Sequence, residues 1–115
     1  MWGKNDNFAE ISIREQKFKT KTHTDGGDVA QWNAKSSTTT MEVVDVSEKM
    51  TVKIFDEDLT SNDLICEGTI DLKLLCLDSP VQEQWFQLQY KDKPAGKICL
   101  SATFTPNQKD GKSDP

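Results

Sequence analysis

Three aspartates stand close together near the middle of the chain, where a segment of alternating polarity ends. Asp56 and Asp58 follow residues 52–55 of this segment and are two residues apart, which puts both carboxylates on one side of an extended backbone. Asp63 returns on the far side of the turn. Calcium takes about 6–8 oxygen ligands, so it needs several carboxylates that converge from short loops. The spacing therefore predicts a calcium cup, with a solvated acidic turn as the alternative.

An EF-hand does not explain the same stretch of sequence. The segment from Asp56 to Glu67 has the length of an EF-hand loop and carries acids at several ligand positions. Ser61, however, stands where that loop requires glycine, and Asp63 stands at a position that is usually apolar. The flanking residues alternate with period two, whereas an EF-hand requires two helices. We therefore expect the acidic turn to connect two strands.

A second candidate site is basic. Lys17, Lys19 and Lys21 alternate with less polar residues, so they share one face of a predicted strand. This pattern is typical of a solvated outer face, where lysine also discourages edge-to-edge pairing of strands. It is equally typical of a site for a phosphoinositide headgroup. The residues alone leave both interpretations open.

Composition limits the classes of function. The chain has 115 residues, enough for one domain, and a net charge of −5, which would repel nucleic acid and anionic lipid alike. We expect no nucleic-acid partner, and any anionic partner must meet a local basic patch or a bound cation. Catalysis is not indicated, because His23 is the one histidine and no phosphate-cradling glycine loop occurs. Three widely spaced cysteines predict reduced thiols and a cytoplasmic setting.

Period-two alternation of apolar residues runs through nearly the whole chain. The predicted strands are Ala9–Ile13, Phe18–Thr22, Met50–Ile54, Ile70–Leu72 and Ile98–Phe104, with weaker candidates at Thr38–Val43 and Trp85–Tyr90. Turn clusters at Asp25–Asp28 and Lys93–Gly96 separate some of them, and a helical turn is expected only around Leu74–Leu77. About seven short strands predict an all-β antiparallel sandwich. Trp32 and Trp85 are expected in its core or at its rim.

An ordered series of motifs resembles the C2 domain family. The segment Val52–Asp63, continued by Glu67–Leu72, resembles the third calcium loop and its flanking strands, in the form found in conventional protein kinase C. The other matching segments are Gly3–Phe8 for the end of the first calcium loop, Lys17–Thr22 for the lysine-rich strand, Gln31–Asn33 for a tryptophan segment, and Trp85–Leu88 with Gly96–Ile98 for the closing strands of the permuted, type II topology.

The resemblance implies an antiparallel eight-stranded C2-type β-sandwich over residues 1–106, followed by a polar, disordered tail at 107–115. Asn7 and Cys66 stand where the family usually has proline and glycine. The family's first strand, and the first aspartate of its first calcium loop, would precede Met1. We therefore expect a protein partner or a neighbouring strand to complete the sandwich.

The resemblance also implies a function. Ca²⁺ would be held by four aspartates, Asp6, Asp56, Asp58 and Asp63, and a lipid headgroup would be contacted by Lys19 and Lys21. The expected activity is calcium-dependent binding to anionic phospholipid membranes, including those with phosphoinositides, by a cytoplasmic, peripheral membrane protein that is not an enzyme. The alternative is a calcium-independent C2 domain that serves as a protein-interaction or structural subunit of a larger assembly.

Overall fold

The computed structural model describes residues 6–20, 37–57 and 62–106, and within these ranges the fold is almost entirely β. The strands are β1 (Asn7–Ile13), β2 (Gln16–Lys19), β3 (Lys49–Glu57), β4 (Asn62–Asp71), β5 (Val81–Tyr90) and β6 (Lys93–Ala102). A short 3-10 helix, η1 (Leu72–Leu74), follows β4. The predicted all-β antiparallel fold is confirmed. Across the described ranges, no helix is long and apolar enough to cross a membrane.

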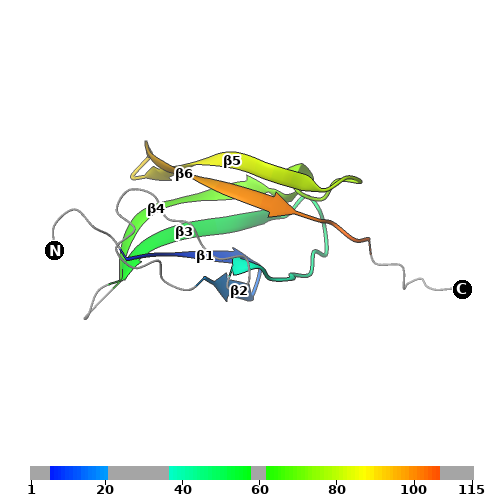
Figure 1. The fold of residues 1–115 in the computed structure, drawn as a ribbon, viewed down its shortest axis with the longest axis horizontal. Coiled ribbons are helices and arrows are strands. Elements are labelled where there is room, and N and C mark those ends of the chain that lie inside the picture. Colours follow the sequence, from blue (N-terminus) through cyan, green and yellow to red (C-terminus); the bar gives the residue numbers. More distant parts are fainter. Residues whose placement is uncertain (1–5, 21–36, 58–61, 107–115) are drawn as a thin grey trace, which may run out of the picture.

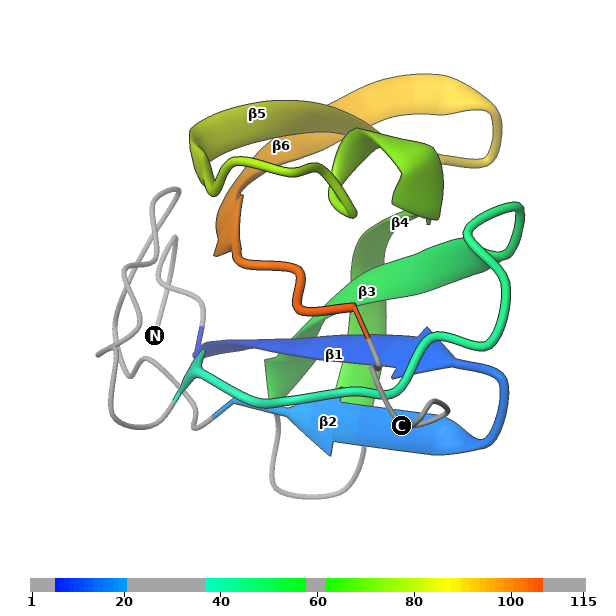
Figure 2. The same ribbon diagram turned by 90° about the vertical axis from the view of Figure 1, so that its right-hand side faces the viewer.

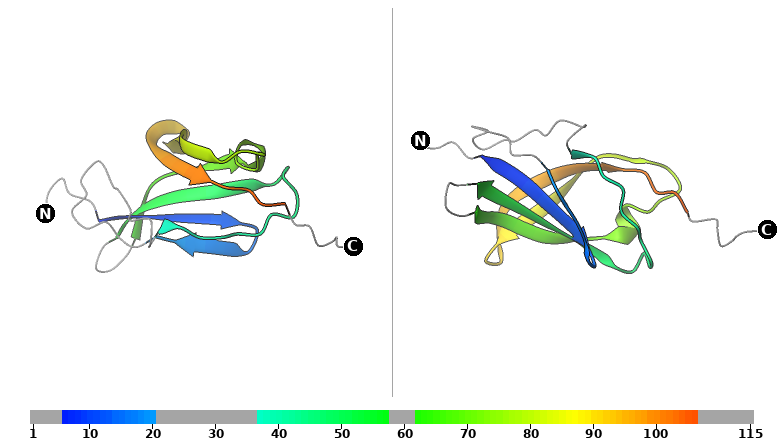
Figure 3. Two further views of the ribbon diagram at one scale, coloured as in Figure 1. Left: turned by 45° about the vertical axis from the view of Figure 1, so that its right-hand side comes forward. Right: turned by 90° about the horizontal axis from the view of Figure 1, so that it is seen from below.

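The strands form two layers, although their ladders are continuous. The order is β2-β1-β3-β4-β5-β6, and every neighbouring pair is antiparallel. β4 and β5 pair only at Glu67 and Gln89, so the β5–β6 hairpin can turn away from the edge of β4. Figures 1 and 3 show this hairpin lying across the layer made by β2, β1, β3 and β4. The result is a sandwich with four strands in one layer and two in the other, counted over the described residues.

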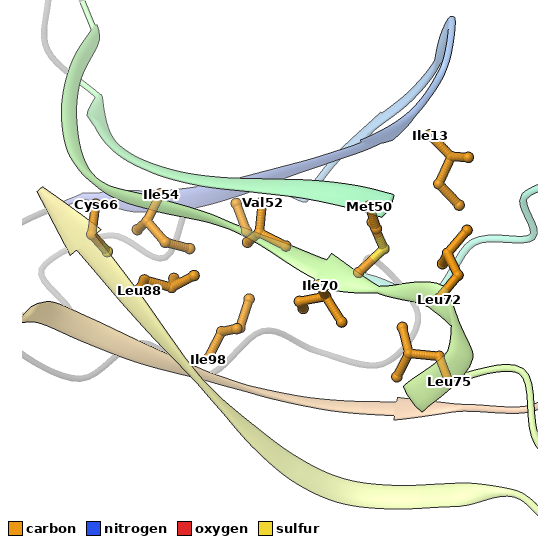
Figure 4. Close-up of a cluster of buried hydrophobic side chains, with 11 residues drawn as sticks. Ile13, Met50, Val52, Ile54, Cys66, Ile70, Leu72, Leu75, Leu88 and Ile98 are labelled. Atoms are coloured by element: carbon orange, nitrogen blue, oxygen red, sulfur yellow. The ribbon is translucent and has the colours of Figure 1, made fainter. Parts of the chain in front are cut away.

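The core lies between the two layers because the strands alternate in polarity. Apolar residues at every second position face inward, and most are buried (Figure 4): Ala9, Ile13, Met50, Val52, Ile54, Cys66, Ile70, Leu88 and Ile98. Leu72 and Leu75 close one end of this core. Gly68 permits close contact between the layers, since a Cβ atom there would lie 3.0 Å from Leu88 Cδ2.

The strand predicted at Thr38–Val43 is wrong. Met41 and Val43 do pack against the core, as period two requires. The backbone of Glu42, however, is bonded by a side chain: its N–H donates to Gln16 Oε1 and its C=O accepts from Gln16 Nε2, each at 2.6 Å. Because a side chain supplies these bonds, no strand ladder forms there.

The turn predicted at Lys93–Gly96 is also wrong, since these residues begin β6. The hairpin turn lies at Lys91 and Asp92, whose φ angles are +51° and +66°. Two central residues with positive φ are typical of the two-residue turn that matches strand twist, and glycine usually marks it. Here no glycine is present to give the signal. The glycine-rich turn at 25–28 lies outside the described residues.

The remaining sequence predictions need smaller corrections. The helical turn is η1, two residues earlier than expected, and Asp71 caps it by accepting from the N–H of Lys73 at 3.0 Å. Trp85 lies on β5 and is 61% exposed, so it belongs to the rim rather than the core. Trp32 lies outside the described residues. All three cysteines are free, and burial raises the pKa of Cys66 and Cys76, which keeps those thiols protonated.

The turn at 44–48 lies at the end of the molecule that faces the viewer in Figure 2. The Ser47 N–H donates to Asp45 Oδ1 at 2.9 Å, and this bond holds the pKa of the Asp45 carboxyl below its ordinary value. Arg14 pairs with Glu48 at 2.9 Å and donates to the Glu42 carbonyl at 3.0 Å. The polar groups of this turn therefore bond to one another and to Arg14, and the Val44 side chain is 72% exposed.

Candidate functional site

Two of the predicted calcium ligands lie opposite each other where β3 and β4 meet their connecting turn. Asp56 pairs with Asp63 across the ladder, so both side chains fall on the same face of the sheet. This pairing depends on a register shift between Ile54 and Phe55. With the register that holds before the shift, Leu64 would face Asp56 and Asp63 would turn to the other side. The irregularity therefore places Asp56 and Asp63 opposite each other on one face.

A third predicted ligand is tied to the same strand end. The Asp6 N–H donates to Asp56 Oδ1 at 3.0 Å, and the Glu57 N–H donates to the Asp6 carbonyl at 2.8 Å. Asn7, the first residue of β1, pairs with Asp56 in the neighbouring ladder. The two hydrogen bonds of Asp6, to Asp56 and from Glu57, are here called the Asp6–Asp56 clasp. They hold Asp6, which precedes β1, against the end of β3.

The donors suit a hard cation in chemical type, because Asp6, Asp56 and Asp63 all offer carboxylate oxygens. Asp6 and Asp56 are half-buried, and Asp63 is exposed. Asp58 lies outside the described residues. Within the ranges that the structure describes, no three acidic, histidine or cysteine side chains are gathered closely enough to hold a metal ion. The three described aspartates therefore do not form a metal site by themselves.

The predicted lysine face lies on the outer side of the same layer. Lys19 is in β2, and its Nζ lies 4.9 Å from the ring centroid of Phe8. Phe8 stacks on Phe55 across the β1–β3 ladder, with centroids 5.2 Å apart. Lys21 lies outside the described residues. Sequence reasoning missed this aromatic pair. A signal was present, because Phe8 follows Asn7 and Phe55 precedes Asp56 in the chain, and period two places the two rings on the face opposite to that of Asn7 and Asp56.

The outer face carries acids as well as lysines. Lys19 in β2 lies opposite Glu10 in β1, Glu10 lies opposite Lys53 in β3, and Lys53 lies opposite Glu67 in β4. Lys17 Nζ is 3.5 Å from Glu10 Oε2. The expectation that Lys17 and Lys19 share a face is confirmed by the β1–β2 register. The charges alternate across the strands, so this face is nearly balanced rather than uniformly basic.

Comparisons with known proteins agree on the fold. The model of the C2 domain family matches residues 1–88. No curated protein matches the sequence. The chain is similar to a solved C2 domain-containing protein attributed to an elicitor-responsive gene, with a TM-score of 0.75 and 22% sequence identity. That match covers 94% of this chain and 78% of the other. At this level of identity, the solved structure supports the fold alone.

Proposed function

Because the chain belongs to the C2 domain family, whose members serve in general as membrane-targeting or calcium-binding modules, we propose that it binds anionic phospholipid membranes in a calcium-dependent manner. The observation that carries this proposal is the Asp6–Asp56 clasp, with Asp63 directly opposite Asp56. It brings acids from three separate parts of the chain to one end of the sandwich.

In this proposal Ca²⁺ is held by Asp56 and Asp63, by Asp6 and by the neighbouring Asp58. These four side chains concentrate negative charge at one end of a chain whose total net charge is −5. Without a cation, such an end is repelled by a membrane leaflet with a surface potential of about −30 mV. A bound calcium ion supplies two positive charges and coordination positions that lipid phosphate can share. The carboxylates would therefore act as the calcium-sensing part of an electrostatic switch.

The outer face offers a second contact to the same membrane. Lys19 is held above Phe8, and the Phe8–Phe55 stack lies one residue away from the acidic strand ends. We assign the headgroup contact to Lys19, together with Lys21. We propose in addition that the chain is a cytoplasmic, peripheral membrane protein that binds membrane lipid and is not an enzyme.

Calcium titration tests this proposal directly. Isothermal titration and vesicle co-sedimentation are carried out with phosphatidylserine vesicles, in chelator and at about 1 mM calcium. Wild type and the control variant Asp78→Asn, which removes the same charge from the connection after η1, should bind vesicles only with calcium. Asp56→Asn should lose most of that gain. Equal binding of wild type in chelator and in calcium, or no binding in either, would reject the switch.

A second candidate function is supported by the unequal layers. β6 is a ten-residue strand that pairs with β5 on one side, and no other described strand pairs with it. Its inward residues Leu100 and Ala102 are only partly buried. A long strand edge of this kind is a template for another strand. A calcium-independent interaction module would pair an extended segment of a partner with β6, and hydrogen exchange would then show slowed amides along that strand in the assembly.

A further inference from the structure

Glu10 has an unusual position on the outer face, because lysines approach it from both neighbouring strands. Lys19 lies directly opposite in β2, and Lys53 lies directly opposite in β3. Lys17 completes the group, with Nζ 3.5 Å from Glu10 Oε2. The Glu10 side chain is 21% exposed, whereas that of Lys17 is 64% exposed. Lys17 is therefore the lysine that pairs with the half-buried carboxylate, and its exposed side chain can swing away, while Lys19 Nζ lies over the Phe8 ring.

Several lysine side chains on one face can receive a phosphate group. Here an anion of the protein, Glu10, stands between Lys19 and Lys53 in the ladders and pairs with Lys17. The three lysines and Glu10 carry a net charge of +2, and Glu67, opposite Lys53, lowers the sum for these five residues to +1. An incoming anion is therefore attracted by the lysines and repelled by Glu10.

We propose that Glu10 is an internal counter-ion that sets the affinity and selectivity of the outer face for phosphorylated ligands. Glu10 competes with an incoming ligand for Lys17 and repels that ligand, so it weakens the binding of a polyphosphorylated group more than the binding of a singly charged group. The ligand class is a cluster of phosphomonoesters, either on a lipid headgroup or free in solution. This inference rests on the lysine part of the proposed function and is independent of the calcium part.

The selectivity has a physical reason: the repulsion between Glu10 and a ligand grows with the charge of the ligand. The gain in affinity when Glu10 is neutralised therefore grows with that charge as well. For a ligand of charge −3 about 7 Å from the carboxylate, Coulomb interaction screened by salt predicts about a three- to tenfold gain in affinity when the charge is removed. For a ligand of charge −1 the same estimate is below about twofold. Phosphatidylserine and polyphosphorylated ligands should therefore respond differently to one substitution.

The test compares Glu10→Gln with wild type in chelator, so that calcium plays no part. The probes are phosphatidylcholine vesicles with phosphatidylinositol 4,5-bisphosphate, the same vesicles with phosphatidylserine, and soluble inositol 1,4,5-trisphosphate. Glu15→Gln is the matched control, because it removes the same charge from a side chain that is 94% exposed beside Arg14. We expect Glu10→Gln to bind the first and third probes about three- to tenfold more tightly and the second within twofold. Glu15→Gln should match wild type.

Substitution of Lys53 tests the inference from the other side. Lys53→Gln should weaken binding of both phosphorylated probes in wild type, and it should remove the gain of Glu10→Gln. A gain with either phosphorylated probe supports the counter-ion, and the probe that responds shows whether the ligand is free or membrane-bound. The inference is overturned if Glu10→Gln unfolds at the wild-type temperature and yet gains affinity for neither phosphorylated probe. It is also overturned if Glu15→Gln gains as much affinity as Glu10→Gln. The calcium-dependent binding of phosphatidylserine, measured on the same variants, reports separately on the proposed switch.

Discussion

Asp56 is expected to have two separable roles, one in the metal-free fold and one in calcium binding. Its Oδ1 accepts the Asp6 N–H at 3.0 Å in a partly buried position. Asp56→Ala removes both this acceptor and the charge. Asp56→Asn removes the charge and keeps an oxygen that can accept the same hydrogen bond. The two variants should therefore differ in unfolding temperature in chelator, and both should lack the stabilisation that calcium gives to wild type.

The magnitudes follow from the two interactions. Loss of a partly exposed hydrogen bond to a carboxylate costs about 1 kcal/mol, which lowers the unfolding temperature of a domain of this size by about 4 °C. Asp56→Asn keeps that bond and relieves the repulsion between residue 56 and Asp63, so its unfolding temperature should stay within about 2 °C of wild type. Calcium at ten times its dissociation constant stabilises wild type by about 1.4 kcal/mol, or about 5 °C.

Thermal unfolding by circular dichroism, in chelator and in calcium, measures both roles with the same three proteins. We expect Asp56→Ala alone to be destabilised in chelator, and neither variant to be stabilised by calcium. If Asp56→Asn is destabilised as much as Asp56→Ala in chelator, the clasp does not stabilise the fold as argued. If Asp56→Asn keeps the full calcium shift, Asp56 is not a calcium ligand.

Three further predictions concern the fold that positions these residues. Gly68→Ala should lower the free energy of unfolding by about 1–3 kcal/mol in chemical denaturation, because the new Cβ would lie 3.0 Å from the fully buried Leu88 side chain; a gain in stability would show that the layers can separate without cost. Asp45→Asn should flatten the pH dependence of stability. The depressed pKa of Asp45 contributes stability above its unfolded-state pKa that is lost as pH falls through the folded-state pKa, so unchanged acid sensitivity of the unfolding temperature would contradict the assignment. Gln16→Ala should cost about 1 kcal/mol and speed hydrogen exchange at Glu42, whose N–H it leaves without its acceptor; protection equal to wild type would mean that another group replaces Gln16.

Most of the fold could be predicted from period two alone. The inner positions of β1, β3 and β6 alternate with polar ones over four residues or more, and the structure buries six of these inner residues: Ala9, Ile13, Met50, Val52, Ile54 and Ile98. Thr38–Val43 shows where this argument stops. Period two reports which face of an extended segment is apolar, but it does not report whether backbone partners exist, and there a side chain of Gln16 supplies the bonds.

The candidate site was less accessible to sequence reasoning, because it depends on register. The spacing of Asp56 and Asp63 places them on the two sides of one turn, but their pairing in the ladder requires the shift between Ile54 and Phe55. Glu10 and Lys53 were missed for the same reason. They are 43 residues apart in the chain, and only the ladder between β1 and β3 makes them neighbours.

Strand geometry joins the two candidate sites into one unit. Asn7 and Asp56 face one side of the layer where β1 pairs with the end of β3, and their chain neighbours Phe8 and Phe55 face the other. A displacement at the end of β3 therefore moves the proposed calcium ligand and the aromatic floor beneath Lys19 together. Because both sites would meet the same anionic surface, calcium bound by the acids and a headgroup bound by the lysines should each favour the same arrangement of this strand end. By linkage, calcium should then raise the affinity for a polyphosphorylated headgroup by the factor by which that headgroup raises the affinity for calcium.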